Sequence, residues 1–136
     1  MVCTFFGHRK LNINLEPTLR SALVDLIENK GVDTFYVGTH GEFDYLVRKT
    51  LKALAKEYSH ISFTVVLAYL SQDVYGIDSS NTIYPEGIEK VPLRCAIVWR
   101  NNWMIDKSDY VVTYVRHNFG GAAQFKERAE KKGKQL

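Results

Sequence analysis

The feature of this chain that most limits its possible folds is the regular alternation of short apolar runs with longer segments of helical periodicity. The apolar runs are rich in β-forming residues and predict strands over residues 2–6, 34–37, 61–70 and 109–115. Apolar residues at helical spacing predict helices over residues 15–30, 43–58, 93–105 and 121–132. Strands that alternate with helices form parallel β-α-β units. We therefore predict an α/β fold: a Rossmann-like three-layer sandwich with a mostly parallel sheet of four to five strands.

The size and composition of the chain suit one compact domain, which we expect to span residues 1–136. Cys3 and Cys95 form no spacing motif and fall in apolar or helical runs, so we expect two core residues in a reducing compartment. Strand-like residues follow Met1 directly, and no apolar run is long enough to span a bilayer. We expect a cytoplasmic protein with neither a signal peptide nor a membrane partner.

The charge and the motifs restrict the possible ligands. The net charge of +3 permits an anionic ligand. The four histidines are scattered and no Cys-x-x-Cys pair is present, so we expect no metal. No complete dinucleotide or P-loop motif occurs, so we predict no cofactor. The basic residues are dispersed, which makes nucleic acid an unlikely partner, although single-stranded nucleic acid stays as an alternative.

The ends of the predicted strands carry the residues best suited to bind a ligand, because ligands of open parallel sheets lie beyond the carboxyl ends of the strands. Glycine lets a ligand approach the backbone, and a helix N-terminus favours phosphate. Glu86 follows in a long polar stretch, where it could orient a ribose. The predicted ligand-binding residues are Gly7, His8, Arg9, Gly38, His40, Gly41, Glu86, Gly120 and Gly121. Each also has an ordinary structural interpretation, as a turn glycine, a loop cap or a solvated charge.

Three segments together resemble the SLOG superfamily, and within it the YpsA/YoqJ-like branch. They are Cys3-Thr4-Phe5-Phe6-Gly7-His8-Arg9, Val37-Gly38-Thr39-His40-Gly41-Glu42-Phe43-Asp44 and Tyr84-Pro85-Glu86-Gly87. The resemblance implies a Rossmann-like fold and the binding of a nucleotide or nucleotide derivative. Its branches include ligand sensors, a protein that binds single-stranded DNA, and the LOG phosphoribohydrolases.

The LOG enzymes, which cut the base from a nucleoside monophosphate, provide a second set of residues. Arg100, Met104 and Ser108-Asp109 match the spacing of their signature, as does the segment from Gly120 to Glu127. By this resemblance Arg100 and Glu127 would be the catalytic residues. The sequence departs from the LOG pattern at Ala123 and Gln124, which replace a glycine and a threonine of the phosphate loop. It also lacks a proline before Gly120, and the connection from Tyr110 to Phe119 is longer than in LOG.

We therefore predict a nucleotide-binding module that acts as a sensor or sequestering protein, with a phosphate-bearing small molecule as its partner. The alternative is an enzyme that hydrolyses an N-glycosidic bond with carboxylate assistance. A homodimer is also plausible, because apolar residues occupy more than one face of the third predicted helix: Trp99, Trp103, Met104 and Ile105. The two tryptophans are core or dimer residues on this interpretation, with base stacking as the other possibility.

Overall fold

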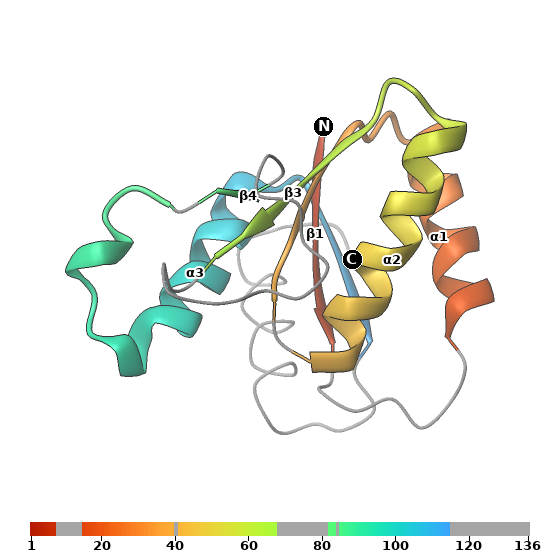
Figure 1. Cartoon of the computed structure of the whole chain (residues 1–136). Helices are drawn as coiled ribbons and strands as arrows, with labels where there is room; N and C mark the ends of the chain where they lie inside the picture. Colours follow the sequence, from red (N-terminus) through yellow and green to blue (C-terminus); the bar gives the residue numbers. More distant parts are fainter. Residues whose placement is uncertain (8–14, 40, 68–81, 84, 115–136) are drawn as a thin grey trace.

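The computed structural model describes residues 1–7, 15–39, 41–67, 82–83 and 85–114 (Figure 1). In chain order its elements are β1 (Val2–Gly7), α1 (Glu16–Asn29), β2 (Thr34–Val37), α2 (Gly41–Glu57), β3 (Ser62–Val66), β4 (Thr82–Ile83), the short 3-10 helix η2 (Ile88–Lys90), α3 (Leu93–Lys107) and β5 (Tyr110–Tyr114). The predicted alternation of strands and helices is confirmed over these residues. The helix predicted over residues 121–132 lies outside them.

The strands form one sheet in the order β4-β3-β2-β1-β5, and every neighbouring pair is parallel. The strand β1 lies inside the sheet, with β2 on one side and β5 on the other. Helices α1 and α2 cover one face and α3 lies on the opposite face, which gives three layers (Figure 1). The predicted Rossmann-like α/β architecture is therefore confirmed.

Each face of the sheet has its own hydrophobic core. On the first face, Cys3, Phe5, Phe35 and Val37 of the strands pack with the apolar stripes of α1 and α2. On the other face, Phe6, Val66 and Val111 pack against Met104 and Ile105 of α3. Successive residues of a strand point to opposite faces, so one continuous apolar run supplies both cores. The predicted helical stripes of α1 and α2 are confirmed because Leu19, Leu23, Leu26, Ile27, Phe43, Val47, Leu51 and Leu54 are buried.

Two details differ from the sequence predictions: the length of one strand and the burial of Cys95. The strand predicted over residues 61–70 is the shorter β3, and only its last two residues, Val65 and Val66, are buried. It lies inside the sheet between β2 and β4, and the two-residue β4 pairs with its last two residues, Val65 and Val66. Cys95 was expected in the core and is exposed, because it lies on the side of α3 that faces away from the sheet; Cys3 is buried as expected.

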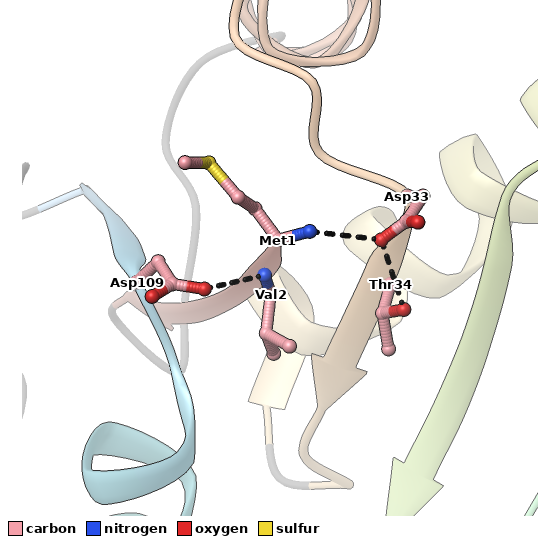
Figure 2. A network of polar contacts seen from close by, with 5 residues as sticks. All are labelled: Met1, Val2, Asp33, Thr34 and Asp109. Carbon is pink, nitrogen blue, oxygen red and sulfur yellow. Dashed lines mark hydrogen bonds and ion pairs between the residues drawn. The ribbon is translucent and has the colours of Figure 1, made fainter.

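At the amino edge of the sheet, exposed carboxylates link the starts of three strands (Figure 2). The N-terminal ammonium of Met1 lies 3.1 Å from Asp33 Oδ1, in the turn before β2. The amide of Val2 donates to Asp109 Oδ2 at 3.0 Å, and the amide of Asp109 donates back to the Val2 carbonyl at 2.7 Å. The start of β1 is thereby joined to the starts of β2 and β5.

In the part of the chain that the structure describes, no helix is both long and apolar enough to cross a membrane.

Candidate functional site

The candidate site lies at the carboxyl edge of the sheet, opposite the edge drawn in Figure 2. Because all paired strands are parallel, Gly7 at the end of β1 and Gly38 just after β2 lie at this same edge. Gly7 pairs with Tyr114, the last residue of β5. The chain reverses its direction of travel across the sheet at β1, since β2 and β3 lie on one side of it and β5 on the other. Open α/β sheets bind their ligands at such a switch point.

Gly7 allows α2 to approach the end of β1 closely. A Cβ on Gly7 would lie 2.8 Å from Phe43 Cβ and nearer still to the Phe43 ring. The buried Phe43 belongs to the first turn of α2, which begins at Gly41. The missing side chain of Gly7 therefore brings the N-terminus of α2 down onto the sheet edge. This packing accounts for a glycine at position 7, and a direct contact of Gly7 with a ligand stays a prediction.

Gly38 is buried between two charged side chains that reach it from different helices. A Cβ on Gly38 would lie 2.7 Å from Asp44 Oδ2 of α2 and 3.3 Å from both Cζ and Nη2 of Arg100 of α3. No larger residue fits at this position without displacing one of these groups. The carboxylate and the guanidinium thus meet at the end of β2, each from its own face of the sheet.

Arg100 is 2% exposed, which is unusual for an arginine. Its Nε donates to Asn101 Oδ1 at 3.0 Å, and its Nη1 donates to the Val66 carbonyl at 3.2 Å and to Thr39 Oγ1 at 3.3 Å. These bonds tie α3 to the ends of β2 and β3.

Arg48 approaches the same point from α2. It is partly buried, and its Nη1 donates to the Gly38 carbonyl at 3.0 Å. Burial lowers the pKa of the Arg48 guanidinium below its ordinary value, and the negative charge of Asp44 offsets part of this effect. An arginine keeps its charge through shifts of this kind. Arg48 is therefore a cation at the border between the core and the solvent.

Among the described residues, the charged side chains that reach Gly38 are two arginines, Arg48 and Arg100, and one carboxylate, Asp44. Asp44 and the exposed Glu42 both lie in the first turn of α2, where acidic side chains already compensate the helix dipole. An anion at this edge would therefore depend on the arginines more than on the helix N-terminus. Guanidinium groups hold phosphate and carboxylate oxygens with directed hydrogen bonds, so the arrangement suits an oxyanion. Over the described residues no group of acidic, histidine or cysteine side chains could hold a metal ion.

The structure brings four of the predicted residues to this edge: Gly7, Gly38, Gly41 and Arg100. Gly41 is exposed and has a positive φ of 92° at the start of α2. Glu86 is also exposed, but it follows β4 at the far end of the sheet order, away from β1 and β5. The remaining predicted residues lie outside the described residues: His8, Arg9, His40, Gly120, Gly121 and Glu127.

Sequence reasoning missed three side chains of the cluster: Thr39, Asp44 and Arg48. Asp44 and Thr39 stand inside the segment that carries the SLOG resemblance, so their positions held a usable signal. Arg48 stands in a helix among other polar residues and offers no such signal.

The surface of α3 is less apolar than its sequence indicates. Met104 and Ile105 are buried against the sheet, and Trp103 packs on Tyr36 with ring centroids 5.3 Å apart. Three of the four residues behind the predicted homodimer, Met104, Ile105 and Trp103, therefore pack in or against the core of the same chain. The homodimer stays a prediction.

A scan against protein-family models finds no match for this chain, and a search of curated proteins finds no similar sequence.

Proposed function

We propose that this protein binds a phosphate-bearing nucleotide or nucleotide derivative at the carboxyl edge of its sheet, as a sensor or sequestering module. The observation that carries the proposal is the approach of Arg48 and Arg100 to Gly38 from opposite faces of the sheet. Guanidinium groups offer directed hydrogen bonds to phosphate oxygens, so two of them at one strand end, among the described residues, would attract an anionic ligand. The fold supports the same edge, because it contains the switch point between β1 and β5.

The two arginines have different parts in this proposal. Arg48 lies at the border with solvent and would contact the ligand phosphate. Arg100 is almost completely buried and bonded to protein groups, so it would hold the ends of β2 and β3. Its positive charge would attract the ligand phosphate without direct contact. The SLOG resemblance points to the same class of ligand. On this proposal Gly38 and Gly41 shape the site by backbone. Ligand contacts by His8, Arg9, His40, Gly120 and Gly121, which lie outside the described residues, stay predictions from the sequence.

The test is calorimetric titration of the protein with nucleoside monophosphates, in parallel with Arg48→Ala and Arg48→Lys. We expect Arg48→Ala to weaken binding about 10- to 100-fold, since a hydrogen bond to a charged group is lost, and Arg48→Lys to retain part of the affinity. Arg20→Ala is the matched control, because Arg20 is an exposed arginine of α1 that pairs with Glu57, the last residue of α2. Equal affinity of the wild type and Arg48→Ala, or no binding by the wild type, would contradict the proposal.

The same samples distinguish binding from catalysis. Chromatography of each mixture after incubation would detect free base. If the wild type releases free base and Arg100→Lys does not, the protein is an N-glycosidase and not a binding module.

A further inference from the structure

The rim of the candidate site carries an exposed aromatic side chain that the functions above do not use. Tyr45 lies on α2, one residue after the buried Asp44, and is 58% exposed. The Cζ atom of Arg48 lies 5.7 Å from the centre of its ring, within the range of a cation–π contact. Tyr45 therefore adjoins the arginine that we assign to the ligand phosphate.

The direction of the helix explains this position. Side chains of an α-helix lean toward its N-terminus, and the N-terminus of α2 lies at the carboxyl edge of the sheet. Asp44, Arg48 and Tyr45 follow one another around the helix surface, from the buried side to the exposed side. The same lean that takes Arg48 to the Gly38 carbonyl directs Tyr45 toward the solvent side of this edge.

We infer that Tyr45 is the residue that selects ligands with an aromatic base, by stacking its ring on that base while Arg48 holds the phosphate. The inference rests on the proposed function. In a nucleotide the base and the phosphate are separated by a single sugar, so a phosphate at Arg48 places the base within reach of a neighbouring side chain. Stacking of a base on an aromatic side chain tolerates every base, because each has a π-face. The contact with Arg48 restricts the ring before the ligand binds, which reduces the entropy lost on binding.

The experiment compares ligands with and without a base. Adenosine monophosphate, cytidine monophosphate and ribose phosphate are titrated into the wild type, Tyr45→Phe and Tyr45→Ala. We expect Tyr45→Ala to weaken binding of both nucleotides about tenfold and to leave the affinity for ribose phosphate unchanged. Tyr45→Phe keeps the ring and should keep the affinity for all of these ligands.

The control is Val98→Ala, because Val98 is another exposed apolar residue, 52% exposed, but lies on α3 on the opposite face of the sheet. An equal loss for ribose phosphate in Tyr45→Ala would overturn the inference, since Tyr45 would then act only through Arg48. Unchanged nucleotide affinity in Tyr45→Ala would also overturn it. Failure of the wild type to bind any of these ligands would instead refute the proposed function, and the role of Tyr45 with it.

Discussion

The amino and carboxyl edges of this sheet hold their charges in opposite ways. At the amino edge, Asp33 and Asp109 are exposed to solvent, and they accept hydrogen bonds from the N-terminal ammonium and from the Val2 amide. At the carboxyl edge, Asp44 and Arg100 are 8% and 2% exposed and meet at Gly38. Water screens the first set, so its members contribute little to stability. The second set lies in a medium of low dielectric, where each charge acts strongly on its neighbours and on a ligand.

This difference indicates where function should be sought in such a fold. A buried charge cluster is costly to maintain and is often replaceable by apolar residues without loss of stability. Its presence at the edge where parallel sheets bind ligands is therefore informative in a way that the exposed pairs of the opposite edge are not. Substitutions at the two edges test this contrast directly.

The largest effect is expected for Arg100→Met. The substitution keeps most of the side-chain volume. It removes the hydrogen bonds that Arg100 donates to the Val66 carbonyl and to the Asn101 side-chain oxygen. It also leaves the buried Asp44 with less positive charge nearby. We expect a loss of about 3 kcal/mol in the free energy of unfolding, measured by urea denaturation. Arg20→Met, at an exposed ion pair, should lower the free energy of unfolding by less than about 1 kcal/mol. Equal losses of stability in the two variants would contradict the contrast between buried and exposed charges.

A somewhat smaller effect is expected for Gly7→Ala. The new methyl group would overlap the Phe43 ring, so α2 must shift away from the sheet edge. Overpacking of this kind costs about 2 kcal/mol. The double variant Gly7→Ala/Phe43→Ala should recover part of this cost, which a double-mutant cycle of urea midpoints would measure. Additive losses would mean that the two residues do not meet.

Thiol labelling would sharpen the contrast by reporting how tightly the amino half of β1 is held. Burial raises the pKa of the Cys3 thiol, whereas Cys95 is exposed on α3. In native protein we expect Cys95 to react with a thiol reagent at the rate of a free cysteine. Cys3 should react at least about a hundredfold more slowly. Mass spectrometry of partly labelled protein measures both rates. Comparable rates would show that the amino edge opens readily.

The smallest effect is expected for Asp33→Asn and concerns acid stability. The hydrogen bond from the N-terminal ammonium is the main cause that lowers the pKa of Asp33, with a smaller contribution from Thr34. A carboxylate with a lowered pKa stabilises the folded state above the ordinary aspartate value of about 3.9, and this contribution disappears as the pH falls through the lower folded value. Wild type and Asp33→Asn should therefore converge in urea midpoint on acidification below that value.

Acetylation of the amino group supplies the control for this last prediction. It removes the ammonium, so the Asp33 carboxyl should titrate nearer its ordinary pKa in an NMR titration. An unchanged titration would assign the lowered pKa to another group.

Most of the fold was predictable because its elements depend on short-range patterns. The strand β2 was predicted with its observed ends, and β1 within one residue, since both are apolar runs ended by glycine. The strand β4 could not be found this way. Its two residues carry no pattern of their own and become a strand only by pairing with Val65 and Val66 of β3. The order of the strands, likewise, depends on how the helices pack and not on any one segment.

The site was predictable only in outline. Glycine after a predicted strand correctly indicated that Gly7 and Gly38 share an edge, because strand direction fixes where each strand ends. Asp44 and Arg48 reach that edge from within a helix, by the lean of their side chains toward its N-terminus. Nothing in the spacing of α2 alone says that Arg48 bonds to the Gly38 carbonyl, since this bond requires the helix to lie on the sheet first.

The position of β1 inside the sheet has a consequence for the synthesis of the protein. Val2 bonds to Asp109, more than a hundred positions later in the chain, and Cys3 to Gly7 pair with β5. A ribosome releases residues in order, so the growing polypeptide must keep one side of this apolar strand without its partner until β5 emerges. Pairings over such separations form slowly. A nascent chain halted before Tyr110 would therefore offer an open strand to chaperones, and one extended beyond Tyr114 could bury it.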